Sequence, residues 1–276
     1  MSLKQSEAIV LRTYPLHEAD LLVTLFTRAE GKVKGVARAA KKSKRRFGGA
    51  LEPLTLVRVY YDDREGKELA RLDSCDILES PLSATVDYPR VVALEHVAEM
   101  LDELLPDREA NDAIFRLTVA VLHQLRSGPI WLPLTYFQLW LVRLVGFLPE
   151  LNECLACGAA LNGSKAFYHA LADGLMCAQH KRLASSQLTP ESRALAAQMF
   201  RAPVGSFAES QTTGTAGEEA RMSGAREAET DVAVGDVAKR FAKSGSPYAD
   251  LRKFLTQIIE RHIEKKLVTA SMLARL

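Results

Sequence analysis

Three cysteines and a histidine near the middle of the chain have the spacing of a metal site. Cys154 and Cys157 form one C-x2-C pair, and Cys177 and His180 form a second pair after nineteen intervening residues. Thiolate and imidazole are the ligands that tetrahedral Zn²⁺ prefers, and four of them fill its coordination shell. The spacing therefore predicts a structural rather than a catalytic zinc. His169 is close enough in sequence to replace His180 as the fourth ligand.

The residues around these pairs favour tight turns. Gly158 can turn the chain after the first pair, and Asp173-Gly174 predicts a hairpin turn before the second. A disulfide is disfavoured because we identify no secretory signal. The fourth cysteine, Cys75, lies in a predicted strand and is expected to be a buried core thiol.

The sequence gives no support for an enzyme. It contains no phosphate-binding loop, dinucleotide-binding motif, zinc-protease helix or nucleophile elbow. A few other polar groups could in principle act as catalytic acids or bases or hold a metal, but they are better explained as turn, surface or helix residues. They are His17-Glu18 with Asp20, the turn at 62–66, His96 and His123. We therefore predict a protein that acts by binding.

The charge distribution indicates a binding surface for a polyanion. The net charge is only +2. Residues 31–46, however, carry eight basic side chains and no acidic one: Lys32, Lys34, Arg38, Lys41, Lys42, Lys44, Arg45 and Arg46. Residues 206–236 hold seven acidic residues against two basic ones, and residues 239–276 hold nine basic against three acidic. Such segregation lets one face attract a polyanion, although a basic run can also be a simple solvated surface.

The first 80 residues have the pattern of a small β-barrel. Short strand-like segments, of which residues 54–61 alternate apolar and polar side chains with period two, are separated by turns that contain glycine. Strands are predicted over 7–13, 21–28, 32–37, 54–61 and 69–78. Five short strands in this length favour the five-stranded OB-fold.

After Pro81 the apolar spacing changes to three and four residues, which predicts helices. Helices are expected over 90–105, 111–125, 134–145, 189–200 and 248–272. Asn111 or Asp112 can cap the second, Gly146 closes the third, and Thr189 caps the fourth. Residues 203–236 have no apolar periodicity and are predicted to be a mobile acidic insertion.

These features place the chain in the α+β class. The expected domains are an N-terminal OB-fold barrel (1–80), a first helical part (81–150), an embedded zinc knuckle (151–185) and a second helical part (186–276). No apolar run approaches the length of a membrane-spanning helix, so a cytoplasmic location is the default expectation.

Several segments together resemble the RecO family of recombination mediators. They are the N-terminal Glu-Ala-Ile-Val-Leu-Arg at 7–12, Glu-Ala-Asp at 18–20, Gly-Lys-Val-Lys-Gly-Val-Ala-Arg at 31–38, Leu-Glu-Pro-Leu at 51–54 and Phe-Leu-Pro at 147–149. The cysteine pairs lie where RecO proteins often carry a four-cysteine zinc motif. This chain has His180 in place of the usual fourth cysteine. The acidic insertion is not a recognised feature of the family.

The resemblance implies binding to single- and double-stranded DNA and strand annealing. It also implies loading of RecA, together with RecR, onto DNA coated by single-stranded DNA-binding protein, in DNA repair and recombination after DNA damage. A bacterial, nucleoid-associated protein with structural zinc is then expected. The partners are DNA, RecR, the acidic C-terminal tail of single-stranded DNA-binding protein and, indirectly, RecA.

Within that picture we expect the DNA contact to be electrostatic. Lys32, Lys34 and Arg38 on the barrel, with the basic side chains of residues 41–46, should contact backbone phosphates without reading bases. Stacking platforms could come from Tyr14, Phe26, Phe47, Tyr60 and Tyr61, although core packing explains most of them better. The basic residues Arg252, Lys253 and Arg261 of the last helix could bind the acidic tail.

Two other classes of function compete with this interpretation. One is a zinc-containing adaptor that works only through protein contacts. The other is a transcription regulator, which is disfavoured because the chain shows no plausible recognition helix.

Overall fold

The structure, a computed structural model, describes residues 3–63, 67–81, 87–207 and 246–276. The chain divides into two compact units. The first comprises residues 1–126 together with 267–275, and the second comprises residues 127–266 with Leu276. The first unit therefore extends beyond the barrel and recruits a segment from the C-terminal end of the chain.

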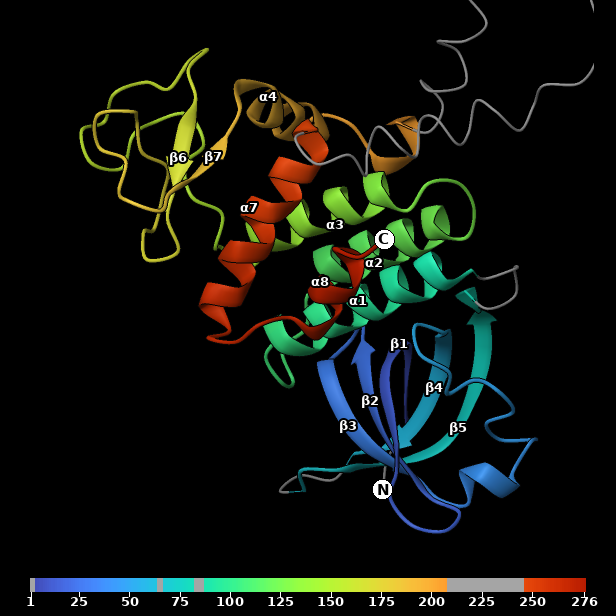
Figure 1. Ribbon diagram of the computed structural model, residues 1–276. Coiled ribbons are helices and arrows are strands. Elements are labelled where there is room, and N and C mark those ends of the chain that lie inside the picture. Colours follow the sequence, from blue (N-terminus) through green and yellow to red (C-terminus); the bar gives the residue numbers. More distant parts are fainter. Residues whose placement is uncertain (1–2, 64–66, 82–86, 208–245) are drawn as a thin grey trace, which may run out of the picture. The chain divides into compact units, whose positions relative to one another are not determined.

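Five strands of the first unit form a closed barrel in the order β1-β2-β3-β5-β4 (Figure 1). They are β1 (Leu3–Pro15), β2 (Leu21–Thr27), β3 (Gly31–Ala37), β4 (Leu56–Asp62) and β5 (Ala70–Glu79). Neighbours pair antiparallel except β3 and β5, whose short parallel pairing closes the barrel. The predicted OB-fold is confirmed, and every predicted strand overlaps an observed one.

Side chains at every second position of the strands fill the barrel interior. On β4, Val57, Val59 and Tyr61 point inward and are at most 1% exposed, whereas the residues between them are partly exposed. Cys75 of β5 joins this core, as predicted, and burial raises the pKa of its thiol to about 12. Phe26 and Phe47 are also buried, as is Tyr61, so these aromatic rings pack the core and are not platforms for bases.

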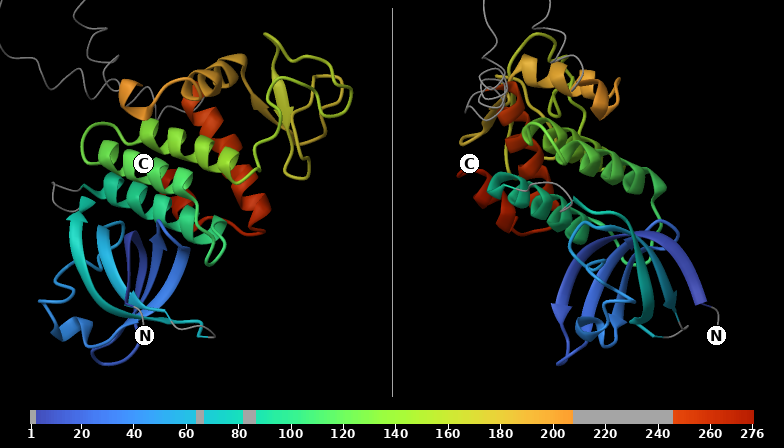
Figure 2. Two further views of the ribbon diagram at one scale, coloured as in Figure 1. Left: turned by 180° about the vertical axis from the view of Figure 1, so that it is seen from behind. Right: turned by 90° about the vertical axis from the view of Figure 1, so that its right-hand side faces the viewer.

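Two helices of the first unit, α1 (Tyr88–Leu104) and α2 (Asp112–Leu125), lie against the barrel (Figure 2). Asp87 caps α1 and Asn111 caps α2 by accepting backbone N–H bonds at 2.9 and 3.0 Å, and the Asn111 cap confirms the sequence prediction. An ion pair of 2.5 Å between Arg12 of β1 and Asp102 of α1 fastens the helix to the barrel.

Gly31 marks the point where the loop between α1 and α2 approaches the barrel backbone. Its φ is +70°, which is a backbone conformation that residues with a Cβ atom rarely adopt. A Cβ atom at this position would lie 2.0 Å from the carbonyl oxygen of Glu109. Both the backbone angle and the lack of space therefore require glycine.

We expect Gly31→Ala to destabilise the first unit by at least about 2 kcal/mol, because the left-handed conformation alone costs about 1–2 kcal/mol and the loop must also move. Urea unfolding followed by the fluorescence of a probe attached to the barrel would measure the loss. Gly49→Ala is the control, since Gly49 also has a positive φ but nothing lies within 4 Å of its added Cβ. Equal losses in both variants would mean that the close approach contributes nothing.

In the second unit, α7 (Pro247–His262) packs against α3 (Trp131–Leu144) and α4 (Pro190–Met199) (Figures 1 and 2). A small sheet of β6 (Ala166–Tyr168) and β7 (Ser186–Leu188) completes this unit. Gly146, with φ +82°, ends the helical segment after α3, and Thr189 caps α4, as predicted.

The predicted last helix over 248–272 is wrong in one respect, because it is two helices. α7 ends at His262, Glu264 adopts a left-handed conformation with φ +55°, and α8 (Val268–Leu273) begins after buried Leu267. The cause is a distant contact. The Glu99 carboxylate of α1 accepts the backbone N–H groups of Val268 and Thr269 and so fixes a new helix start.

Most of the predicted acidic insertion at 203–236 lies outside the described residues, which end at Phe207 and resume at Ser246. Val204, at its start, is 5% exposed. In the described part of the chain, no helix combines the length and apolar character needed to cross a membrane.

Candidate metal centre and nucleic-acid interface

The first cysteine pair lies on a tight turn in the knuckle, defined here as residues 151–185. The backbone N–H of Gly158 donates to the carbonyl of Cys154 at 2.8 Å, and Cys154 in turn donates to Ala159 at 2.9 Å. Gly158 has φ +68°, as the predicted turn requires. This turn brings both thiols to the same side of the loop.

The second pair follows a hairpin whose two limbs meet at Phe167 and Met176. These residues exchange backbone hydrogen bonds of 2.9 and 2.8 Å, and Cys177 follows directly. The turn predicted at Asp173-Gly174 is displaced, because the chain reverses earlier, where Ala172 donates to His169. Gly174 instead serves packing, since an added Cβ would lie 3.2 Å from the Cβ of Leu155.

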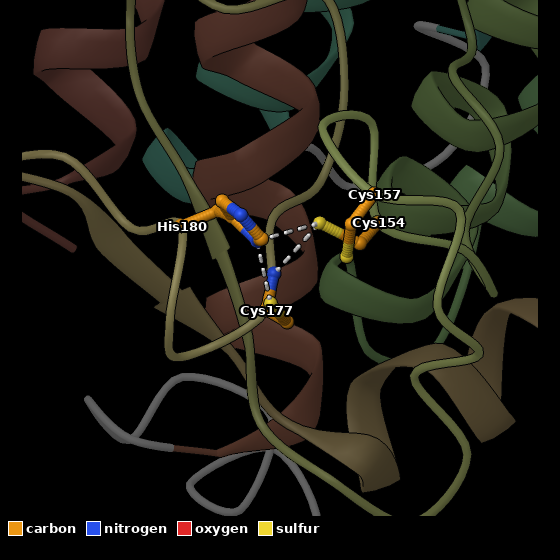
Figure 3. Close-up of side chains that lie close together, drawn as sticks. All are labelled: Cys154, Cys157, Cys177 and His180. Carbon is orange, nitrogen blue, oxygen red and sulfur yellow. Dashed lines mark hydrogen bonds between the residues drawn. The ribbon is translucent and has the colours of Figure 1, made fainter.

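The four predicted ligands converge (Figure 3). The ligand atoms of Cys154, Cys157, Cys177 and His180 all lie within 4.8 Å of one another. His180 Nδ1 is 3.2 Å from Cys177 Sγ and 4.0 Å from Cys154 Sγ. Tetrahedral ligands with metal–sulfur bonds of about 2.3 Å are separated by about 3.8 Å, so the set fits a metal ion. His169 is not in the group, and its Nδ1 accepts the N–H of Leu171.

The local electrostatics favour the thiolate form at two of the three cysteines, Cys154 and Cys177. Burial raises the pKa of Cys154, but N–H groups directed at its sulfur, including that of Cys177 at 3.3 Å, outweigh burial and lower it. Backbone N–H groups likewise lower the pKa of Cys177 against its burial. The N–H of Ala159 lowers the pKa of Cys157, but the neighbouring sulfurs raise it by more. A divalent cation among the sulfurs would remove that repulsion.

Arg193 of α4 anchors the knuckle, and sequence analysis gave no sign of it. Its guanidinium donates to the backbone carbonyls of Leu151 at 3.2 Å and of Leu161 and Ser164 at 2.6 Å each. The residue is only 6% exposed. A guanidinium group carries five N–H donors in a rigid planar arrangement, so it can bind several carbonyls from separate loops at once. An arginine at this point of a helix looks like any solvated charge in a single sequence.

We expect Arg193→Leu to loosen the knuckle, because three buried carbonyls lose their donors at about 1–3 kcal/mol each. The measurement is the rate at which a chelator strips bound metal, which should rise at least tenfold. Arg201→Leu is the control, since Arg201 is exposed just beyond the end of the same helix. Identical stripping rates in wild type and Arg193→Leu would exclude the anchoring role.

The predicted DNA-contact residues divide into three groups. The side chains of Lys41, Lys42, Lys44 and Arg45 are exposed, as is Arg38 just before them. Residues 41–46, the basic loop, begin in the 3-10 turn Ala40–Lys42. Within the described residues these exposed cations form one ion pair, between Lys42 Nζ and the Glu18 carboxylate at 3.9 Å. Exposed pairs at such a distance contribute little, so the loop keeps its positive potential.

Arg46 holds the basic loop in place. Its guanidinium donates to the carbonyl of Arg38 at 2.6 Å and to Ser43 Oγ at 3.2 Å, and it lies over the ring of Phe47. Its own carbonyl accepts the N–H of Cys75 at 2.9 Å. Arg46 is therefore a positioning residue for the loop.

Lys32 and Lys34 are engaged with the loop after α1. Lys32 is 8% exposed, donates to the carbonyl of Asp102 at 2.6 Å and pairs with Asp107 at 3.3 Å. Lys34 pairs with the same Asp107 at 3.2 Å. Burial raises the pKa of Asp107, but the two lysines outweigh burial and lower it. These contacts leave Lys32 little capacity to bind a phosphate.

The three residues of α7 predicted to bind the acidic tail also differ in whether their charged groups are exposed or already have a partner. Arg252 lies 4.4 Å above the ring of Trp131, and burial lowers its pKa to about 10. Arg261 pairs with Asp173, whereas Lys253 is exposed. Of the remaining predicted platforms, Tyr14 is 49% exposed and Tyr60 is partly exposed.

Comparison with known proteins gives the family. The model described as "Recombination protein O N terminal" matches residues 1–81, and "Recombination protein O C terminal" matches residues 86–221. The chain belongs to the RecO family. A RecO from Koribacter versatilis, strain Ellin345, is 61% identical over 99% of both chains.

More distant RecO proteins match a shorter stretch. A RecO from Geobacter sulfurreducens is 38% identical over 62% of this chain and 70% of its own, and one from Geobacter metallireducens is 34% identical over 71% and 79%. All three relatives are named DNA repair protein RecO. The predicted resemblance is thus confirmed at the level of the family.

Proposed function

We propose that this RecO protein is a DNA-repair recombination mediator that binds single- and double-stranded DNA and anneals strands without being an enzyme. The observation that carries the proposal is the basic loop. Four exposed cations, Lys41, Lys42, Lys44 and Arg45, project from one loop of an OB-fold barrel, and the side chain of Arg46 holds this loop in place. Such a surface contacts backbone phosphates irrespective of sequence. The names of the relatives agree with this role.

The metal in the knuckle is proposed to be zinc with a structural role. Three thiolates and one imidazole at tetrahedral separations are a preferred zinc set, and four protein ligands leave no position for a reactive water. Cys154, Cys157, Cys177 and His180 would hold the ion, which cross-links the two halves of the knuckle.

The remaining partners follow from the family. With RecR, the protein would load RecA onto DNA coated by single-stranded DNA-binding protein, whose acidic C-terminal tail would be recognised by basic residues of the helical part. Lys253 is the exposed cation among the three predicted for this contact. A nucleoid-associated protein of the bacterial cytoplasm is the corresponding location.

The test is fluorescence anisotropy of a labelled oligonucleotide and its duplex, titrated at several salt concentrations. Wild type is compared with a variant in which Lys41, Lys42, Lys44 and Arg45 are changed to Ala. Arg46 is kept because it positions the loop. Each lost phosphate contact lowers the log–log salt slope by about 0.7 on single strands, so the variant should lose up to about 3 units.

The control changes two exposed cations of other segments, Lys165→Ala and Arg275→Ala, and should retain the wild-type slope. Weak binding with a flat slope in wild type and variant alike would exclude the electrostatic DNA contact. In that case a zinc-containing adaptor that acts only through protein contacts becomes the better description.

A further inference from the structure

A hollow of about 330 Å³ opens at the end of the barrel where β3, β5 and β4 run side by side. It is lined by Val36, Arg38, Asp62, Lys67, Leu69, Ala70 and Arg71. Its volume reaches the lower end of the range of ligand sites, which is about 300–1,000 Å³. None of these residues belongs to the barrel core except Ala70.

The strand register explains why these side chains share one face. Arg71 of β5 is paired with Val36 of β3 on one side and with Asp62 of β4 on the other. Directly opposed residues of neighbouring strands point to the same face of a sheet. Arg71 is exposed, so this row lies on the outer face of the barrel, and Arg38 follows Val36 at the period of two.

The lining combines positive charge with an apolar surface. Arg38, Lys67 and Arg71 are exposed, and within the described residues none of them forms an ion pair. Asp62 is the acidic member of the lining. Leu69, whose side chain is also part of the lining, remains 41% exposed. A ligand that suits this hollow carries a negative charge beside a flat apolar group.

The hollow is continuous with the basic loop. Arg38 lies three residues before Lys41, and its carbonyl accepts a hydrogen bond of 2.6 Å from Arg46, the residue that positions the loop. A strand whose phosphates follow the exposed cations of the loop therefore reaches Arg38 and the hollow next. The hydrogen bond from the Arg46 side chain to the Arg38 carbonyl fixes this connection, and both segments belong to one compact unit.

We propose that this hollow receives one nucleotide of a single DNA strand, an inference that rests on the proposed DNA-binding function. The phosphate lies among Arg38, Lys67 and Arg71, and the base lies against Leu69. A base of a single strand can leave the stack, whereas a paired base cannot without the cost of unpairing. The hollow therefore distinguishes single-stranded from double-stranded DNA, which the basic loop alone does not.

Two variants separate the two halves of the site. Leu69→Ser removes the apolar surface and should weaken binding of a labelled oligothymidylate about fivefold, the size expected for the loss of one leucine contact. Its effect on a duplex of the same length should stay below twofold. Lys67→Gln with Arg71→Gln should lower the single-strand salt slope by about 0.7–1.4 units, for one or two lost phosphate contacts. Each altered side chain is exposed, so folding should be preserved.

The control for the charge change is Arg201→Gln with Arg275→Gln, which removes two exposed cations elsewhere and should leave both slopes unchanged. If Leu69→Ser weakens single strands and duplex equally, or weakens neither, the nucleotide site is wrong even though wild type still binds DNA through the basic loop. If the wild-type protein itself does not bind DNA with a salt-dependent affinity, the proposed function is wrong. The wild-type titration shows this before any variant of the hollow is measured.

Discussion

Changing Cys154 to Ser should abolish stoichiometric zinc binding and unfold the loops of the knuckle. Cys154 is the buried ligand of the four, 2% exposed, and its sulfur also accepts the N–H of Cys177. Binding of structural zinc contributes apparent free energies of about 10–16 kcal/mol in small zinc domains, and this energy is folding energy. Regular structure in the knuckle is limited to the three-residue strand β6 and two isolated bridges, and backbone hydrogen bonds such as that from Leu155 to Leu175 are too few to replace the ion.

Metal content would be measured in wild type and variant by mass spectrometry, and amide exchange over residues 151–185 would report the folding of the knuckle. We expect one zinc per wild-type chain, less than a tenth of that in Cys154→Ser, and fast exchange throughout the knuckle. Cys75→Ala is the matched control, because Cys75 is a buried thiol of the barrel core outside the cluster. It should keep the zinc and lose stability only in the first unit.

Two results would contradict this expectation. One is a wild-type protein, purified without chelator, that contains no zinc. The other is a Cys154→Ser protein that retains a full equivalent of zinc, which would place the ion at other ligands. A chelator that removes the ion from wild type should reproduce the exchange pattern of the variant, since both remove the same cross-link.

Local sequence signals were sufficient for much of the fold and for the convergence of the four residues that could hold a metal ion. The alternation of buried and partly exposed residues on β4 arises because successive residues face the core and the solvent in turn. The same alternation of apolar and polar residues is visible in the sequence. The caps Asn111 and Thr189 act on backbone groups within three residues. Likewise, both ligand pairs are short motifs, and the fold has only to bring the two turns together. In each case the relevant contact is near in sequence or demanded by residue type.

The features that sequence reasoning missed all depend on distant contacts. One such feature is the engagement of the Lys32 ammonium group by Asp102 and Asp107, which are seventy residues or more away. Arg193 reaches carbonyls of loops some thirty to forty residues earlier. The break between α7 and α8 is set by Glu99 of α1. A single sequence does not indicate which of many charged residues find buried partners.

The Glu99 contact leads to the second large prediction, which concerns the attachment of α8. Glu99 is 7% exposed, and its carboxylate accepts the N–H of Val268 at 2.8 Å, the N–H of Thr269 at 3.0 Å and the hydroxyl of Thr269. The Nδ1 atom of His96 lies 2.6 Å from the same hydroxyl oxygen. Glu99→Ala removes the acceptor for three donors, at about 1–3 kcal/mol for each that stays buried, so α8 should detach from α1.

Hydrogen exchange of the α8 amides would measure this detachment, with at least tenfold faster exchange expected over Val268–Leu273. Glu95→Ala is the matched control, because Glu95 lies on the same helix but is exposed. Unchanged α8 exchange in Glu99→Ala would show that apolar packing alone holds the helix.

The same contact predicts the response of α8 to acid. Burial raises the pKa of Glu99, but the donated hydrogen bonds outweigh burial, so its pKa lies below the ordinary value of 4.5. A carboxylate whose pKa is lowered in the folded state contributes its full stabilisation of that state at any pH above its ordinary pKa. This stabilisation is lost as the pH falls through the pKa of the folded state. In wild type, exchange at α8, corrected for the intrinsic rate, should therefore stay constant from neutral pH to about 4.5 and accelerate below it. In Glu99→Gln, which cannot ionise, the acid-dependent step should disappear. A step of equal size in both proteins would assign it to another carboxylate.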